Sequence, residues 1–175
     1  RGVFSNIIVF MPQTSLNSMS NNIFKSLDKD KKYSTLDPES LEKAIEIIQA
    51  YAEDELNSLL FIDDQAPFLK DPDIKQYLNM LVCNRRHYRL SIMLLTQSFL
   101  QVPLSPLRKC ITHLTMFKPS NKREGMALFE ELLFMPKEVY EKVIEYVFGK
   151  KHDFMFVDIA MSHIYKNWNR LLISE

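Results

Sequence analysis

A short apolar segment that ends in two adjacent carboxylates constrains the fold of this chain more than any other feature. The segment is Leu59–Ile62, and Asp63 and Asp64 follow it directly. Consecutive large apolar residues bounded by polar ones are typical of a strand buried on both faces, as in a parallel sheet. Ligands bind at the carboxyl ends of strands in open α/β sheets. The segment therefore predicts an α/β fold with a candidate site at Asp63 and Asp64.

Further strands and helices alternate along the chain. Apolar runs predict strands at 6–12, 59–62, 91–97, 112–117, 154–159 and 164–173. Apolar residues at three- and four-residue spacing predict helices at 38–56, 72–86, 122–133 and 136–148, with short helices at 21–27 and from Ser105–Pro106. Asp37-Pro38 and Asp71-Pro72 supply a capping acid followed by proline at the first helical position. The order favours one α/β domain over residues 1–175, with a mostly parallel sheet covered by helices.

Composition excludes some classes of protein and leaves others open. Lysine and arginine together number 22, as do aspartate and glutamate, so net charge gives no evidence for or against nucleic acid. Cys83 and Cys110 lack the spacing of a metal site and are interpreted as free thiols in a reducing compartment. No apolar run approaches the roughly 18 residues needed to span a membrane.

Asp63 and Asp64 have the chemistry of a nucleotide-hydrolysing site. Mg²⁺ prefers oxygen ligands and often keeps several waters, so one carboxylate together with nucleotide phosphates suffices to hold it. A second carboxylate at the strand end is able to orient an attacking water. Two other interpretations stay open: acids that simply cap a strand and form a turn, and an acidic phosphoacceptor pocket of flavodoxin type.

Gln97 ends the next predicted strand, 91–97, within Thr96-Gln97-Ser98. If the two strands are neighbours, its side chain lies beside the acids. An amide both donates and accepts hydrogen bonds, so Gln97 is able to contact a water and a phosphate oxygen together and to sense the γ-phosphate. The alternative is a loop glutamine without a role in chemistry.

Three arginines, Arg85, Arg86 and Arg89, surround His87 between the second long helix and the strand 91–97. Cations at the carboxyl end of a helix are favoured by its dipole, which is one interpretation. A second is an arginine finger that reaches the nucleotide of a neighbouring subunit. A third is contact with DNA phosphates.

These motifs together resemble a known family. The segments LLFIDD, NRRHYRLSIMLLTQSF and LRKCITHLTMFKP are similar to those of genome-packaging ATPases of large DNA viruses, in the FtsK–HerA branch of P-loop ATPases. The resemblance is to the poxvirus-type packaging ATPase in particular, and it extends over residues 6–168. It implies a RecA-like three-layer α/β sandwich that binds ATP and Mg²⁺.

The resemblance also implies roles for individual residues. Asp63 stands where the family has the acid that holds Mg²⁺ and nucleotide, and Asp64 where it has the catalytic acid. Gln97 matches the glutamine that senses the γ-phosphate. Arg86 is the first choice for the arginine finger, and Arg85, Arg89 and Arg108 are alternatives.

The function implied by the resemblance is an ATP-hydrolysing motor that moves viral double-stranded DNA into the capsid. The implied assembly is a homo-oligomeric ring at a viral capsid or portal vertex, in the host cytoplasm (the virus factory) or with the virion. Two alternatives remain: another FtsK/HerA-type DNA translocase, and a degenerate non-catalytic α/β module that binds protein or DNA.

One departure from the family is large, because GxxxxGK[ST] occurs nowhere in the 175 residues. Family members carry this phosphate loop upstream of the position where this sequence begins, after a first core strand that lies between the fourth and fifth strands. Without that strand, segments 91–97 and 112–117 would each expose an unpaired edge. We therefore expect this chain alone to bind nucleotide poorly and to aggregate.

Overall fold

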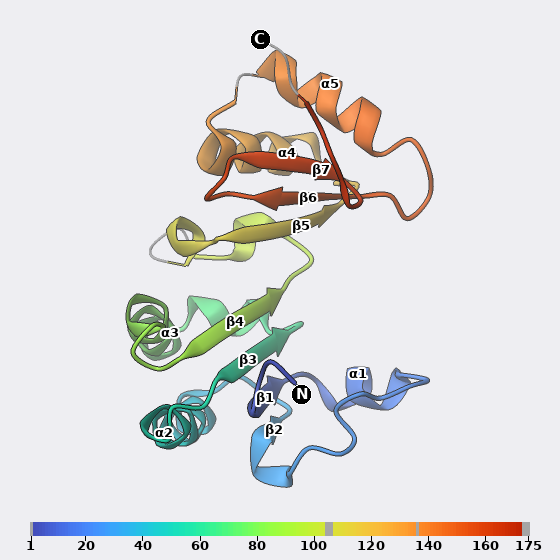
Figure 1. Cartoon of the computed structure of the whole chain (residues 1–175). Helices are drawn as coiled ribbons and strands as arrows, with labels where there is room; N and C mark the ends of the chain where they lie inside the picture. Colours follow the sequence, from blue (N-terminus) through green and yellow to red (C-terminus); the bar gives the residue numbers. More distant parts are fainter. Residues whose placement is uncertain (1, 104–106, 136, 173–175) are drawn as a thin grey trace. The chain divides into compact units, whose positions relative to one another are not determined.

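The computed structural model describes residues 2–103, 107–135 and 137–172. It divides into two compact units, residues 1–108 and 109–175, each with its own sheet (Figure 1). In the first unit the elements are β1 Asn6–Phe10, α1 Gln13–Ser18, β2 Lys32–Tyr33, α2 Pro38–Glu53, β3 Ser58–Asp63, α3 Pro72–Asn84 and β4 Leu90–Leu95. In the second they are β5 His113–Phe117, α4 Lys122–Leu128, α5 Lys137–Val147, β6 Phe154–Asp158, β7 His163–Lys166 and β8 Asn169–Arg170. The helix predicted from Ser105–Pro106 lies outside the described residues.

The first unit contains the parallel sheet that the sequence predicts. Its strand order is β2-β1-β3-β4, and every neighbouring pair is parallel. Phe10 of β1 lies opposite Ile62 of β3, and Asp63 of β3 lies opposite Leu95 of β4. The carboxyl ends of these three strands therefore meet at one edge of the sheet.

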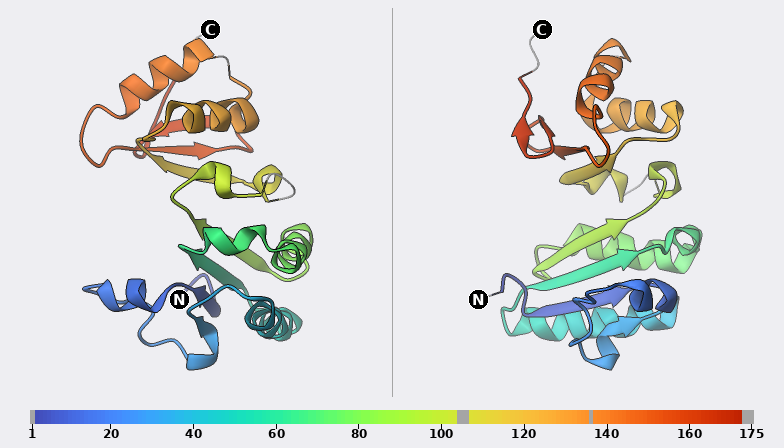
Figure 2. Two further views of the ribbon diagram at one scale, coloured as in Figure 1. Left: turned by 180° about the vertical axis from the view of Figure 1, so that it is seen from behind. Right: turned by 90° about the vertical axis from the view of Figure 1, so that its right-hand side faces the viewer.

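Helices α2 and α3 begin where the sequence places them. The Asp37 carboxylate accepts a hydrogen bond from the Ser40 amide, and the Asp71 carboxylate accepts from the Asp73 and Ile74 amides. Each acid satisfies helix amides that have no partner within the helix and is followed by proline at the first helical position. The two helices lie side by side against the sheet (Figure 2).

Strand β3 is fully buried on one face and half-buried on the other, so the prediction of burial on both faces was wrong. Leu60 and Ile62 are fully buried, whereas Leu59 and Phe61 remain partly accessible. On this second face, Phe24 packs against Phe61 with ring centroids 5.1 Å apart. The neighbouring strand β4 leaves Met93 51% exposed there, so the cover is incomplete.

The prediction of a helix at 21–27 was also wrong, because the helix of this region is α1, at Gln13–Ser18. The Asn22 side chain accepts a hydrogen bond from the Phe24 amide and donates one to the Leu16 carbonyl. Such side-chain bonds compete with helical backbone bonds and favour turns. Strand β2, which follows, was not predicted; its Tyr33 ring stacks on Phe10 at 4.7 Å.

The second unit has an antiparallel sheet, β5-β6-β7-β8, with α4 and α5 on one face (Figure 2). Met155 and Val157 of β6 are fully buried. The strand predicted at 164–173 is instead the hairpin β7–β8. Asn167 takes a φ of 54° at its turn, a left-handed conformation that asparagine tolerates. The segment 122–133, predicted as one helix, consists of α4, which ends at Leu128, and a π-helical turn at Phe129–Leu133.

Aromatic rings line the other face of this antiparallel sheet. Phe117 lies opposite Phe154, and Phe156 lies opposite Tyr165. Trp168, from the turn between β7 and β8, packs its ring 5.2 Å from Phe154 and 5.4 Å from Phe156. These contacts fix the terminal hairpin on the sheet.

Candidate active site

Asp64 and Gln97 meet at the carboxyl edge of the parallel sheet. Because β3 and β4 are hydrogen-bonded neighbours with Asp63 opposite Leu95, the residues just past each strand lie side by side. The Gln97 amide nitrogen donates a hydrogen bond to the Asp64 carboxylate over 3.3 Å. Both side chains are exposed at this edge and accessible to a ligand. The sequence predicted this proximity on the condition that the two strands are neighbours, and they are.

The backbone turns sharply at Asp64. Its φ is 54°, in the left-handed region that few residues other than glycine adopt. Strand β3 ends at the residue before, so the turn places the Asp64 carboxylate at the end of the strand. Unusual backbone conformations of this kind cost free energy and gather at functional sites.

Asp63 is partly buried, and burial raises the pKa of its carboxyl above the ordinary value. The negative charge of Asp64 raises this pKa further, while a hydrogen bond from the Asp64 amide lowers it. A cation at this position would favour the ionised form. No cluster of three or more His, Cys, Asp or Glu ligands occurs among the described residues. The adjacent carboxylates still fit Mg²⁺, which binds through one or two carboxylates when phosphates and waters complete its shell.

Gln65 is a part of this site that the sequence analysis missed. Its side chain is 1% exposed. The side-chain oxygen accepts from the Leu36 amide at 2.8 Å, and the nitrogen donates to the Ser34 carbonyl at 3.4 Å. Gln65 therefore ties the turn that carries both acids to the segment before α2. Its position directly after the acid pair was the signal available in the sequence.

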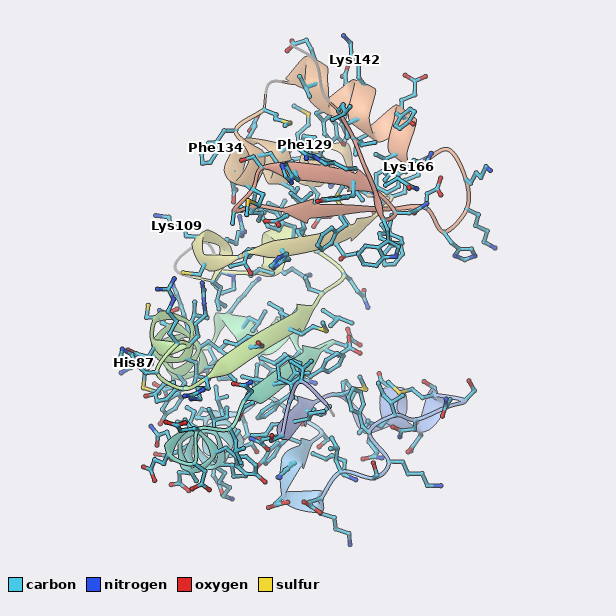
Figure 3. The ribbon with its side chains drawn as sticks, viewed as in Figure 1. His87, Lys109, Phe129, Phe134, Lys142 and Lys166 are labelled. Carbon is cyan, nitrogen blue, oxygen red and sulfur yellow. The ribbon has the colours of Figure 1, made fainter. Side chains whose placement is uncertain are left out.

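The three arginines lie at the opposite edge of the sheet. Arg85, Arg86 and Arg89 precede Leu90, the first residue of β4, whereas Gln97 follows the end of that strand. A strand of this length spans about 20 Å at roughly 3.3 Å per residue, too far for an arginine to reach the acids of its own chain. The arginines instead line a cavity of about 320 Å³ with Asn57. His87, in the same segment, is exposed near the end of α3 (Figure 3).

The arginines differ in their surroundings. Arg86 is exposed, whereas Arg89 forms an ion pair with Glu55 at 3.7 Å. Arg108 is 8% exposed and donates to the Val102 carbonyl at 2.7 Å and to the Leu100 carbonyl at 3.0 Å. Its guanidinium also lies over the Phe99 ring, 4.7 Å from the centroid. These contacts hold Arg108 within its own loop.

Solved structures of viral packaging NTPases resemble this chain over most of its length. The DNA-packaging ATPase B204 of Sulfolobus turreted icosahedral virus superimposes with a TM-score of 0.69 at 17% identity, over 95% of this chain and 83% of B204. The genome-packaging NTPase B204 of Sulfolobus turreted icosahedral virus 2 with AMPPCP gives 0.64 at 17% identity, over 95% and 84%. The same protein with ATPγS gives 0.61 at 19% identity, over 95% and 83%.

These similarities establish the fold, a mixed α/β structure shared with these packaging NTPases. No protein-family profile matches the chain. No curated protein sequence matches it either. None of the helices in the described parts of the chain is long and apolar enough to cross a membrane.

Proposed function

We propose that this protein hydrolyses ATP at the carboxyl edge of its parallel sheet. The observation that carries the proposal is the hydrogen-bonded pair Asp64–Gln97 beside the partly buried Asp63. This pair lies where open α/β sheets bind ligands, in a fold shared with NTPases solved as nucleotide-analogue complexes. Asp63 would hold Mg²⁺, which supplies positive charge to the phosphate oxygens.

Each residue has a defined part in the reaction. Asp64 orients a water and accepts its proton as the water oxygen attacks the γ-phosphorus and the bond to the ADP oxygen breaks. Gln97 holds Asp64 through a hydrogen bond from its amide nitrogen. The Gln97 carbonyl oxygen is then able to accept from the attacking water, and the second amide hydrogen is able to reach a phosphate oxygen. Gln65 positions both acids through the segment before α2.

Arg86 would act on a neighbouring subunit in a homo-oligomeric ring. It lies about 20 Å along the sheet from the acids of its own chain, so a role in charge stabilisation requires a second subunit. Its exposure leaves the guanidinium accessible. An arginine supplied by a neighbour stabilises the charge that develops during phosphoryl transfer.

The ATPase would drive double-stranded viral DNA into a capsid. The support is the shared fold with the packaging NTPases and the resemblance in the LLFIDD and TQS segments. The work of such a motor belongs at a capsid or portal vertex, within the infected host cell or the virion. Association with capsids would separate packaging from another FtsK/HerA-type translocation function.

The alternative is a non-catalytic binding module. Asp64 has a left-handed φ and its carboxylate accepts a hydrogen bond from Gln97, and an acid that only forms a turn at a strand end has these same features. A module of this kind would keep the fold and its ligand edge without hydrolysing nucleotide.

Substitution of Asp64 distinguishes the two candidates. Asp64→Asn keeps the size of the side chain and its bond to Gln97 but removes the proton acceptor, so we expect ATP turnover to fall by about 100-fold or more. Asp54→Asn is the matched control, because Asp54 is exposed and ends α2 at the other edge of the sheet. Equal turnover in wild type and Asp64→Asn would reject the catalytic proposal, and binding of an ATP analogue measured alongside would show whether nucleotide still enters.

A further inference from the structure

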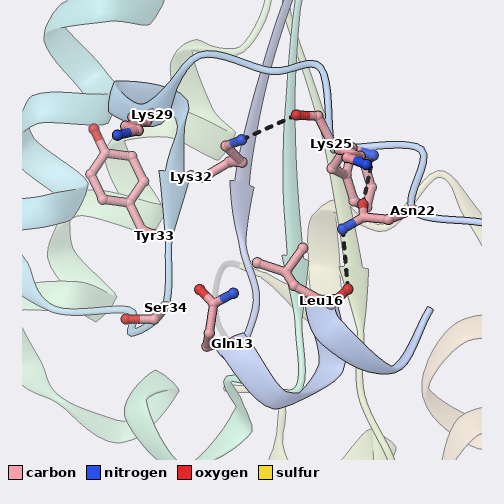
Figure 4. Close-up of a pocket in the computed structure, with 9 residues that line it drawn as sticks. Gln13, Leu16, Asn22, Lys25, Lys29, Lys32, Tyr33 and Ser34 are labelled. Atoms are coloured by element: carbon pink, nitrogen blue, oxygen red, sulfur yellow. Dashed lines mark hydrogen bonds between the residues drawn. The ribbon is translucent and has the colours of Figure 1, made fainter.

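Three lysines surround a cavity beside β2 that the proposed reaction does not use. The cavity has a volume of about 290 Å³ and is lined by Lys25, Lys29 and Lys32 together with polar side chains (Figure 4). Gln13 and Asn22 contribute amides to its wall. No aspartate or glutamate lines it.

In the part of the chain that the structure describes, these lysines form no ion pair with a nearby acid, although Asp30 is close enough for its charge to raise the pKa of Tyr33, which also lines the cavity. None of the ion pairs among the described residues involves Lys25, Lys29 or Lys32. The acid Asp28, in the same segment, lies 3.8 Å from Lys31, which does not line the cavity. Like charges gathered around one concavity raise the local concentration of anions.

The cavity is supported by a fixed wall. Lys32 belongs to β2 and lies opposite Val9 of β1. Leu16 and Phe24 pack with Val9 in one buried cluster, which holds the loop that carries Lys25. Lys32 also donates weakly to the Lys25 carbonyl at 3.5 Å. The lysines are therefore held around the cavity by the core beneath them.

The cavity lies close to the edge of the sheet that carries the acids. Gln13 follows β1 directly after Pro12, and Phe10 at the end of β1 lies opposite Ile62, just before Asp63. With β2 and β3 on either side of β1, the lysine cavity and the acids are separated by two strand spacings, about 10 Å. Phe24 lines the cavity and packs on Phe61, whose side chain shares a face of β3 with Asp63.

We propose that this lysine cavity binds phosphate groups. Ammonium groups act as point charges toward phosphate, and the amides and hydroxyls of the wall donate further hydrogen bonds. The phosphate belongs either to a nucleic-acid backbone or to a free phosphate compound such as a nucleotide. The inference goes beyond ATP hydrolysis at Asp64, since the cavity shares no residue with that site.

The test compares two double variants of the full-length protein with equal changes in charge. Lys25→Gln/Lys29→Gln removes the two exposed lysines of the cavity, and Lys150→Gln/Lys151→Gln removes two exposed lysines of the second unit. Binding of a short DNA duplex is measured over a range of salt concentrations. For a nucleic-acid ligand, the cavity variant should bind the duplex about tenfold more weakly than wild type. The magnitude of the slope of log K against log salt should fall by about 2, whereas the control should keep the wild-type slope.

The second arm is a titration with pyrophosphate that is monitored by NMR of the lysine side chains. If the source is a free phosphate compound, pyrophosphate should shift the NMR resonances of the cavity lysines in wild type. Duplex binding should then be equal in all variants. The single substitution Lys29→Glu, at an exposed side chain, repeats both arms with less risk to folding. Asp64→Asn should bind phosphate in the cavity as wild type does, so failure of catalysis and failure of this inference are separable. If neither duplex nor pyrophosphate distinguishes the cavity variants from the control pair, the inference is wrong.

Discussion

At the scale of residues, Asp63 illustrates how a site residue lowers the stability of the fold. Its carboxyl is partly buried and lies next to Asp64, so its pKa is raised in the folded protein. A raised carboxyl pKa means that the folded state binds the proton more tightly than the unfolded state does. The contribution to stability is therefore present at low pH and is lost as pH rises from the ordinary aspartate pKa, about 3.9, through the raised value.

Asp63→Asn should raise the melting temperature at pH 7 while it removes ATP turnover, because the amide carries no charge to desolvate. The gain over wild type should shrink as pH falls through the raised pKa of Asp63 toward the ordinary aspartate value of about 3.9, because Asp63 in folded wild type is then protonated. Thermal unfolding at several pH values measures this. A gain that is the same at every pH would show that the titration of Asp63 is not its cause.

Gln65→Leu should destabilise the protein by about 1–3 kcal/mol, because the Leu36 amide loses its buried hydrogen-bond partner. Urea unfolding measures the loss. Gln49→Leu, at an exposed glutamine, is the control and should change stability little. If Gln65 positions the acids, the pH dependence of ATP turnover should also shift in Gln65→Leu. An unchanged pH profile would show that Gln65 stabilises the fold but does not position the acids.

At the scale of elements, the close packing of α4 against α5 depends on Gly125. A Cβ atom at this position would lie 2.5 Å from the Tyr140 hydroxyl oxygen. Tyr140 is 4% exposed, and its ring packs edge-on against Phe129 at 5.0 Å. The tyrosine is therefore held in place, and the glycine makes room for it.

Gly125→Ala should lower the free energy of unfolding by about 1–3 kcal/mol, since overlap in a packed interface exceeds the gain in helix propensity of about 1 kcal/mol. Tyr140→Phe removes the atom that a Cβ meets first. The double variant Gly125→Ala/Tyr140→Phe should therefore lose less stability than the two single variants summed. Strict additivity in urea unfolding would contradict this account of the contact.

At the scale of the whole molecule, the sheet separates the acids and Gln97 from the arginines. Asp64 and Gln97 lie at the carboxyl edge, and Arg86 lies at the amino edge. In the proposed mechanism, a subunit would complete a site only by contributing its Arg86 to another subunit. Oligomerisation would therefore be part of catalysis.

Mixing two inactive variants tests this arrangement. Arg86→Ala subunits keep their acids, and Asp64→Asn subunits keep their arginine, so mixed rings should regain part of the ATP turnover that each variant lacks alone. Turnover should be greatest at intermediate ratios. Arg123→Ala, at an exposed arginine of α4, is the control and should retain turnover by itself. Mixtures no more active than their components would contradict a finger supplied by a neighbour.

Much of the local structure was predictable because its signals are local. Asp37-Pro38 and Asp71-Pro72 marked the starts of α2 and α3, and apolar runs located β1, β3 and β4. Where the prediction of an element failed, a competing local interaction of one side chain or one turn was the cause. Asn22 bonds its own neighbours and prevents the helix predicted at 21–27, and Asn167 turns the last predicted strand into a hairpin.

The sequence by itself determined that strands end in acids and in a glutamine, and that an arginine segment precedes the strand that ends at Gln97. The tertiary structure alone decided which of these groups meet. Strand order and register bring Asp64 to Gln97, bury Gln65 and place the arginines at the far edge. The packing of Leu16 and Phe24 against Val9 builds the wall of the lysine cavity. The physical reason is that periodicity encodes which face of an element is buried, whereas neighbours in a sheet are set by contacts between segments distant in the chain.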